Sequence, residues 1–197
     1  MFLKRGLILC EGETEENYFK GIVTEDKHRR KFASIDVKIY KPKDHSPKGL
    51  VDEAKNRISE AESIKDPYDF VWVVFDKDGH ANVPQAFNEA RASRPSIDIA
   101  FTVRCFEYYV LLHFEKTTGA FVNCDEVITR LKRYSPDYEK ASNLFRELEQ
   151  QMSTGLENSE WCLNQCENDL RRGRQPYDLS AYSNIHELVN FLYTLVE

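Results

Sequence analysis

The chain has 197 residues, of which 41% are hydrophobic, and a formal net charge of -6 at pH 7. This length and apolar content suffice for one domain with its own buried core. The negative charge argues against the broad basic surface of a protein that coats DNA, because Lys and Arg carry most of the affinity for phosphate backbones. The longest apolar runs are far shorter than the ~20 residues of a membrane helix, and the N-terminus lacks a signal-peptide pattern. We therefore expect a cytoplasmic protein without a membrane partner.

Strand and helix patterns alternate through the first half of the chain. Apolar or alternating segments predict strands at residues 6–10, 35–40, 70–75 and 97–103. The third segment is continuously apolar, which is typical of a central strand covered on both faces. Apolar stripes at helical spacing follow each strand. This order favours right-handed crossovers and a mostly parallel sheet.

The last third of the chain has a helical pattern. Apolar positions recur at helical spacing near residues 125–134, 137–152, 156–171 and 184–196. Gly155 is expected to separate two of these helices. We therefore predict an α/β catalytic core over residues 1–118 and a helical extension over residues 119–197, packed together as a single compact domain.

Two acidic motifs follow predicted strands at the same edge of the sheet. Glu11, with Gly12 after it, ends the first strand, and Asp76 and Asp78 in FDKDG end the third. Ligands of open α/β sheets bind beyond the carboxyl ends of the strands. Asp76 and Asp78 are expected to face one ion while Lys77 points elsewhere, because alternate residues of an extended segment share a direction. One such acid alone more often caps a turn, but two motifs of hard oxygen ligands favour Mg²⁺ or Mn²⁺.

The cysteine spacing does not indicate a disulfide framework or a zinc site. The five cysteines are Cys10, Cys105, Cys124, Cys162 and Cys166. Their odd number and scattered spacing predict reduced thiols. Cys162 and Cys166 lie one helical turn apart without a second pair at zinc-finger spacing, so packed helix cysteines are the favoured interpretation.

Three segments, ILCEGETEENYF, VWVVFDKDGH and CFEYYVLLHFE, resemble the RloB-like family. The fold of that family is similar to the Toprim domain shared by topoisomerases, primases and OLD-type nucleases. The resemblance spans most of the chain, including the final segment SNIHELVNFL. It implies an α/β fold with a Toprim-like (Rossmann-like) parallel sheet of about four strands flanked by helices, and a helical C-terminal extension.

The resemblance also implies roles for individual residues. Glu11 matches the glutamate that serves as general acid/base or metal ligand, and Asp76 and Asp78 match the aspartates that bind the cation. Glu107 resembles a further family acid at the start of the helix after the fourth strand. The chain departs from the family pattern just before this helix, where residues 103–104 are Val-Arg in place of Asn-Pro.

Other residues are candidates for accessory roles or for contacts with nucleic acid. Glu15 either reaches the same metal or stabilises the dipole of the first helix, and His80 and Lys77 are accessory candidates beside the aspartates. Two basic clusters either contact nucleic-acid phosphates or form solvated faces. The residues of these clusters are Lys27, Arg29, Arg30, Lys31, Arg171, Arg172 and Arg174, and His28 lies within the first.

The resemblance implies a Mg²⁺-dependent nuclease that hydrolyses phosphodiester bonds of DNA or RNA. It further implies an effector of a phage-defence or restriction-linked system with an AAA- or ABC-type ATPase partner. The chain has no Walker A motif, so it is not itself a P-loop ATPase. Self-association into a homo-oligomer stays open.

Two alternatives remain. The segment VVFDKDG resembles the motif of haloacid dehalogenase-like phosphatases, but that motif normally opens the domain, whereas here a strand followed by Glu11 and Gly12 precedes it. The second alternative is a non-catalytic metal-binding regulatory module of an ATPase complex. Like charges gathered at one edge repel without a metal, which favours catalysis over a pure scaffold.

Overall fold

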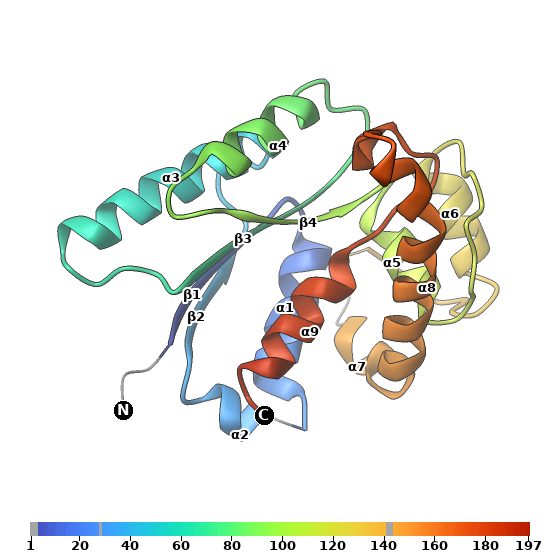
Figure 1. Cartoon of the computed structure of the whole chain (residues 1–197). Coiled ribbons are helices and arrows are strands. Elements are labelled where there is room, and N and C mark those ends of the chain that lie inside the picture. Colours follow the sequence, from blue (N-terminus) through green and yellow to red (C-terminus); the bar gives the residue numbers. More distant parts are fainter. Residues whose placement is uncertain (1–3, 28, 141–143) are drawn as a thin grey trace.

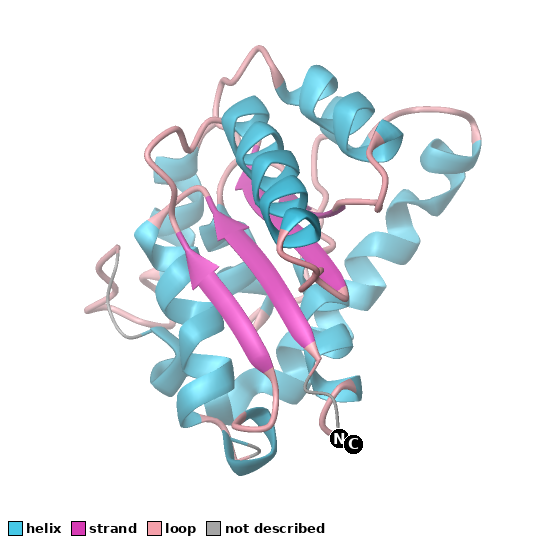
Figure 2. Ribbon diagram, turned by 90° about the vertical axis from the view of Figure 1, so that its left-hand side faces the viewer, coloured by secondary structure: helices cyan, strands magenta, loops and turns pink. Residues whose placement is uncertain are grey.

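The chain folds around a parallel β-sheet. The computed structural model describes residues 4–27, 29–140 and 144–197. These residues form one sheet in the strand order β2-β1-β3-β4. The strands are β1 (Arg5–Cys10), β2 (Asp36–Tyr40), β3 (Phe70–Asp76) and β4 (Asp98–Thr102). Their arrows run side by side in one direction (Figure 2). The predicted Rossmann-like α/β class with a parallel sheet is confirmed.

Helices cover both faces of the sheet (Figure 1). The first five are α1 (Glu13–Glu25), α2 (Arg29–Phe32), α3 (Pro47–Ser63), α4 (Val83–Ala92) and α5 (Phe106–Leu112). Helices α3 and α4 pack on one face, and α1 packs on the other beside α9 (Ile185–Thr194). Ser46 begins α3 by accepting a hydrogen bond from the N–H of Gly49, and Pro47 occupies a first-turn position that needs no N–H donor.

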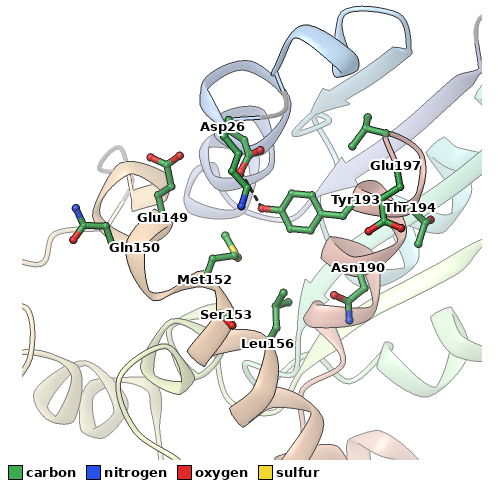
Figure 3. A pocket seen from close by; sticks show the side chains of 12 residues that line it. Asp26, Glu149, Gln150, Met152, Ser153, Leu156, Asn190, Tyr193, Thr194 and Glu197 are labelled. Atoms are coloured by element: carbon green, nitrogen blue, oxygen red, sulfur yellow. Dashed lines mark hydrogen bonds between the residues drawn. The ribbon is translucent and has the colours of Figure 1, made fainter.

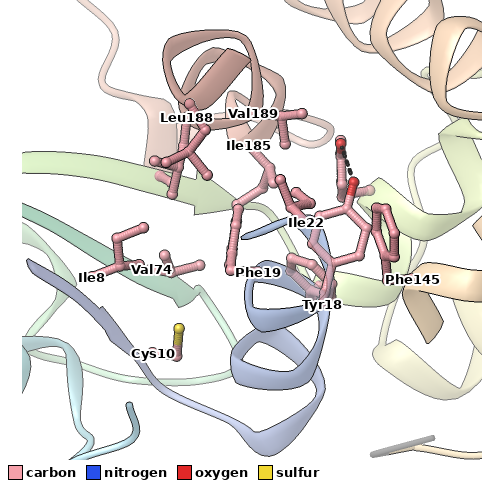
Figure 4. Packing of buried hydrophobic residues seen from close by; sticks show 14 of the residues in the cluster. Ile8, Cys10, Tyr18, Phe19, Ile22, Val74, Phe145, Ile185, Leu188 and Val189 are labelled. Atoms are coloured by element: carbon pink, nitrogen blue, oxygen red, sulfur yellow. Dashed lines mark hydrogen bonds between the residues drawn. The ribbon is translucent and has the colours of Figure 1, made fainter. Parts of the chain in front are cut away.

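The alternating side chains of β3 serve two hydrophobic cores. Every residue of this strand is buried. Trp72 and Val74 face the helices α1 and α9, whereas Val71, Val73 and Phe75 face α3 and α4. Figure 4 shows part of the first core, including Tyr18, Phe19, Ile22, Leu188 and Val189. A sheet packed on both faces is a rigid base for side chains at its carboxyl edge.

The last connection of the chain covers the open edge of β4. Ser183 forms an antiparallel bridge with Thr102. The side chain of Asn184 accepts a hydrogen bond from the N–H of Phe101 at 2.7 Å and donates to the carbonyl of Ile99 at 2.9 Å. An amide side chain therefore replaces a neighbouring strand for these backbone groups, which leaves less unpaired edge for other chains to pair with.

The C-terminal third is helical as predicted, with two boundaries that differ. Its remaining elements are α6 (Cys124–Leu131), α7 (Leu144–Leu148), η1 (Glu149–Gln151), α8 (Met152–Arg171) and η2 (Pro176–Asp178). A single helix over residues 137–152 was the wrong prediction, because α7 and the 3-10 turn η1 occupy its second half. Residues 141–143 lie outside the described ranges.

Gly155 does not separate two helices but lies inside α8. A Cβ atom at this position would lie 2.5 Å from the ring of His113, so the glycine permits close packing of α8 on the residue after α5. The division at residues 118 and 119 stays a prediction. Within the described ranges, no helix combines the length and apolarity that crossing a membrane requires.

Two cysteines overturn the expectation of reduced thiols. Cys105 and Cys124 form a disulfide, with their Cα atoms 5.7 Å apart. Cys105 is the N-cap of α5, and Cys124 is the first residue of α6. The fold brings these two helix starts together, which no local spacing in the sequence predicts. The other cysteines, Cys10, Cys162 and Cys166, are free and buried.

Candidate functional site

Glu11 and Asp76 meet at the carboxyl edge of the two central strands. Glu11 directly follows β1, and its N–H donates to the carbonyl of Val74 on β3 at 2.9 Å. Its Oε2 accepts a hydrogen bond from the N–H of Asp76, the last residue of β3, at 2.9 Å. The parallel pairing of β1 with β3 thus brings together the two predicted acids that end these strands.

Glu15 and Glu107 complete a cavity of about 350 Å³, called the acidic hollow below. Glu15 comes from the first turn of α1 and Glu107 from the first turn of α5, and both side chains are buried. Gly12 lies so close to the Glu15 carboxylate that a Cβ atom there would overlap it. The lining is Glu11, Gly12, Glu13, Thr14, Glu15, Lys41, His45, Asp76, Phe106, Glu107 and Lys140.

The carboxyl groups of the hollow oppose one another's ionisation. Burial, with smaller contributions from Glu11 and Glu107, raises the pKa of Glu15 to about 7. Burial and then the charges of Glu11 and Glu15 raise the pKa of Asp76 well above its ordinary value. Burial also raises the pKa of Glu11, against the N–H of Asp76 and His80, which lower it. A bound cation would offset this repulsion.

One oxygen of Asp76 has no hydrogen-bond partner in the part of the chain that the structure describes. Its Oδ1 is buried and forms no hydrogen bond with any residue that the structure describes. Buried polar atoms in folded proteins are nearly always satisfied, by protein, by water or by an ion. Carboxylate oxygens are the ligands that Mg²⁺ and Mn²⁺ prefer. The buried Oδ1 of Asp76 is therefore a candidate ligand for a divalent cation, with the carboxylates of Glu11 and Glu15 lining the same hollow.

Asp78 lies beside the hollow and does not line it. Its side chain is exposed, and its N–H donates to the carbonyl of Arg104 at 3.3 Å. The chain turns here through Gly79, whose φ of 75° is a conformation that favours glycine. Asp78 still contributes to the raised pKa values of Glu11 and Asp76. The two aspartates therefore differ in position, one buried at the strand end and one on the turn.

His80 holds the Glu11 carboxylate from the outer side. Its ring atom Nε2 lies 2.7 Å from Glu11 Oε1, and its backbone N–H donates to the carbonyl of Lys77 at 2.9 Å. Lys77 continues the sheet pairing, with its N–H donating to the carbonyl of Thr102 at 3.1 Å. Lys77 is not part of the lining, so of the accessory candidates Glu15 lies in the hollow and His80 contacts a residue of it.

Glu107 is held by residues from the helical extension. Its Oε1 accepts a hydrogen bond from the hydroxyl of Tyr138 at 3.0 Å and lies 3.7 Å from Lys140 Nζ. Its Oε2 lies 3.4 Å from Cys124 Sγ. The turn before α5 places Arg104 at a φ of 80°, at the point where the chain departs from the family pattern. The first turn of α5 nevertheless carries Glu107 to the hollow.

Cationic and aromatic neighbours of the hollow were not predicted. Lys41 and His45 follow β2, and their position beyond the carboxyl end of a strand was a usable signal. Tyr138 and Lys140 follow α6, and nothing in the sequence pattern associates them with the acids. These side chains come from separate loops and converge only in the folded chain.

The predicted basic clusters lie apart from the hollow. The first cluster, at residues 27–31, spans the connection from α1 to α2 at the amino end of the sheet, and His28 lies outside the described residues. In the second cluster, Arg171 pairs with Glu167 and Arg174 with Asp169, within or just after α8. None of the described clustered residues lines the acidic hollow.

A second cavity, of about 650 Å³, lies between the end of α1, the start of α8 and the end of α9 (Figure 3). The Tyr193 hydroxyl donates to Asp26 Oδ2 at 3.1 Å across it, and Lys27 of the first basic cluster forms part of its lining. It contains none of the predicted acids. The chemistry suggested by the strand-end motifs therefore belongs to the smaller acidic hollow.

A family model described as RloB-like protein matches residues 6–192. The chain belongs to the RloB-like family. Searches of curated proteins and of solved structures each returned no match. In this RloB-like chain, the matched region includes Glu11 and Asp76 at the ends of β1 and β3, and helix α5, which carries Glu107. It also includes Ser183 and Asn184, which cover the edge of β4.

Proposed function

We propose that this RloB-like chain is a Mg²⁺- or Mn²⁺-dependent nuclease of Toprim type that hydrolyses phosphodiester bonds of DNA or RNA. The observation that carries the proposal is the buried Oδ1 of Asp76, which has no hydrogen-bond partner among the described residues and lies beside Glu11 and Glu15 in an open hollow. A buried carboxylate oxygen without a donor is costly unless a ligand satisfies it. Family membership supports the proposal, through the resemblance of these motifs to Toprim-like sites.

The chain's own residues divide into metal ligands, proton carriers and phosphate contacts. Asp76, with Glu11 or Glu15, would hold the cation, which when bound supplies positive charge beside the phosphoryl oxygens of the substrate. His80 fixes Glu11 through the contact at 2.7 Å. Glu15 has a pKa of about 7 without a cation, which suits a group that accepts or donates a proton near neutral pH.

Cationic residues at the rim would contact the substrate backbone. Lys41, from the segment after β2, and Lys140, from the segment after α6, both line the hollow, and the Lys140 side chain is 60% exposed. Their positive charges are suited to orienting a phosphodiester over Asp76. Without a cation, the carboxylates of the hollow would repel the negatively charged phosphodiester. The clusters at residues 27–31 and 171–174 would contact nucleic acid only outside the hollow.

The resemblance to RloB-like proteins extends the proposal to biological context. By that resemblance the chain would act as the effector of a phage-defence or restriction-linked system, together with an AAA- or ABC-type ATPase. The exposed surface of the helical extension is where such a partner would be sought. A metal-binding module without catalysis is the competing interpretation that the experiment below separates.

The test is cleavage of labelled single-stranded DNA, double-stranded DNA and bulk tRNA by the purified chain in Mg²⁺, Mn²⁺ or EDTA. The decisive variants are Asp76→Asn and Glu11→Gln, which keep the size of the side chain and remove its charge. Glu62→Gln is the matched control, because Glu62 is an exposed acid of α3 away from the hollow.

We expect the wild type and Glu62→Gln to cleave nucleic acid only when the cation is present. We expect no cleavage by Asp76→Asn or Glu11→Gln. The substrate that is cut then names the class of nucleic acid. Cleavage in EDTA, or full activity in Asp76→Asn, would contradict the proposal. Metal binding without cleavage of any substrate would favour the regulatory module.

A further inference from the structure

The disulfide between Cys105 and Cys124 lies against a carboxyl group of the acidic hollow. Cys124 Sγ is 3.4 Å from Glu107 Oε2 and 3.8 Å from Lys140 Nζ. The potential ligand atoms of Cys105, Glu107 and Cys124 all lie within 4.8 Å of one another. Because the two sulfurs are bonded to each other, the trio cannot act as a set of free thiol ligands in this structure. A disulfide bond thus directly borders a carboxyl group that lines the acidic hollow.

We propose that Cys105 and Cys124 form a reducible dithiol site that controls metal binding in the acidic hollow through Glu107. The inference rests on the proposed function, because it assigns a regulation to the same hollow. Neither cysteine takes part in the proposed hydrolysis. The proposal rests on the contact between Cys124 Sγ and the Glu107 carboxylate. A disulfide and a thiol differ chemically at this contact, so the redox state can change the position of the carboxylate.

The two redox states differ in the hydrogen bonds that they offer Glu107. A disulfide sulfur has no hydrogen, so Cys124 cannot donate to Oε2 in the oxidised form, and Tyr138 and Lys140 hold the carboxylate at Oε1. A thiol at the same place is a donor, although a weak one. Reduction therefore gives Glu107 a new donor on the side away from Tyr138 and draws its carboxylate toward the sulfurs.

Other contacts keep the connection between α5 and α6 in place after reduction. The Tyr108 hydroxyl donates to the carbonyl of Thr117 at 2.8 Å, and Arg104 Nε donates to the carbonyl of Phe121 at 2.5 Å. These bonds do not depend on the sulfurs. The change on reduction is thus expected at Glu107 and its neighbours, and the fold of the connection is expected to persist.

The geometry also indicates which sulfur a reductant reaches. Cys105 is buried, whereas Cys124 is partly exposed. A thiolate of an external dithiol attacks Cys124 Sγ, the bond to Cys105 breaks, and Cys105 leaves with the electron pair and takes up a proton. The second thiol of the reductant then attacks the mixed disulfide and releases Cys124 as a thiol. The dithiol is oxidised to a disulfide while the protein disulfide is reduced to two thiols.

The experiment compares oxidised protein with protein reduced by dithiothreitol and desalted without air. Peptide mapping first tests the Cys105–Cys124 link, and calorimetry with Mn²⁺ then measures affinity in each form. We expect about tenfold weaker Mn²⁺ binding in the reduced form, because the negative charge of Glu107, which lines the hollow together with Glu15 and Asp76, moves away from the cation. Cys124→Ser cannot form the bond and always offers a donor, so it should bind Mn²⁺ as weakly as the reduced form under both conditions.

Two further variants separate control through Glu107 from a general loosening of the fold. In Glu107→Gln the difference between oxidised and reduced protein should disappear, whatever the remaining affinity is. Cys166→Ser is the matched cysteine control, because a serine hydroxyl can replace the contact of Cys166 Sγ with the carbonyl of Ala181. This control should keep the full redox difference.

The outcomes separate the two proposals. Absence of the Cys105–Cys124 link, equal Mn²⁺ affinity in both forms, or a redox difference that persists in Glu107→Gln would overturn the control by the dithiol. A redox difference in Mn²⁺ affinity without cleavage of any nucleic acid would overturn the nuclease and leave the control standing. Failure of both forms to bind Mn²⁺ would overturn both.

Discussion

Replacing Glu15 by Gln should stabilise the chain at neutral and alkaline pH in the absence of divalent cations. Glu15 is buried among other acids, and its pKa in the folded chain is about 7, against an ordinary value of 4.5. Gln has nearly the same shape and retains an oxygen that accepts hydrogen bonds. The substitution therefore removes the charge while it preserves the packing around the first turn of α1.

The magnitude follows from the difference between the two pKa values. Below pH 4.5 the carboxyl group of Glu15 is protonated in both the folded and the unfolded chain, so its ionisation costs no stability there. As the pH rises toward 7, the unfolded chain loses this proton first, and the free energy of unfolding falls by about 1.4 kcal/mol per pH unit. The loss reaches about 3 kcal/mol above pH 7, which for a chain of this size corresponds to roughly 6–12 °C in the melting temperature.

Urea unfolding of the wild type, Glu15→Gln and the exposed-acid control Glu62→Gln measures the effect at pH 4.5 and pH 8 in EDTA. The free energy of unfolding of Glu15→Gln should be higher than that of the wild type at pH 8 and closer to it at pH 4.5. The difference at pH 8 should become small when Mg²⁺ is added, because the cation stabilises the wild type. A Glu15→Gln protein that is no more stable than the wild type at pH 8 in EDTA would refute the electrostatic reasoning.

Three further changes test other parts of the structure. Replacing Cys105 and Cys124 together by Ala should lower the free energy of unfolding by about 3 kcal/mol, because the disulfide closes a loop of 19 residues in the unfolded chain; denaturant curves should show the same loss for reduced wild type. His80→Ala should weaken Mn²⁺ binding about tenfold in a calorimetric titration, because Glu11 loses the group that orients it, and an unchanged affinity would contradict that role. Asn184→Ala should cost about 2 kcal/mol, measured by thermal unfolding with circular dichroism, because buried backbone groups of β4 lose their partners; a neutral effect would mean that water replaces the amide.

The elements that the sequence predicted well are those that depend on local pattern. The continuous apolar run of β3 and the apolar stripe along α3 are local patterns that predict which side chains are buried. Both elements form as predicted. The closeness of Glu11 and Asp76 was also predictable, because parallel strands end at a common edge. These inferences need only residue periodicity and the topology of crossovers.

The predictions that failed depend on contacts between distant residues. Gly155 has the appearance of a helix end, yet it lies within α8 because the ring of His113 requires the space. The disulfide partners are 19 residues apart on different helices. Alternation along an extended segment predicted Asp78 beside Asp76; the chain leaves the strand at Asp76 and turns at Gly79, which places Asp78 near Asp76 but outside the lining of the hollow, and its role as a ligand stays a prediction.

The remaining residues of the hollow could not have been found by pattern. Lys140 reaches Glu107 from the segment after α6, which packs against the core only after the chain has folded. The direction of a side chain in such a segment is set by tertiary contacts, because neither periodicity nor spacing constrains it. Its role in the hollow is visible only once the helical extension has been placed on the sheet.

The most direct test of the central claim is anomalous diffraction from crystals of the chain grown with Mn²⁺. A peak is expected in contact with Asp76 Oδ1 and with a carboxylate oxygen of Glu11 or Glu15, and it should be lost in Asp76→Asn. A peak only at another place on the molecule, or an unchanged peak in Asp76→Asn, would contradict the assignment of the acidic hollow as a metal centre.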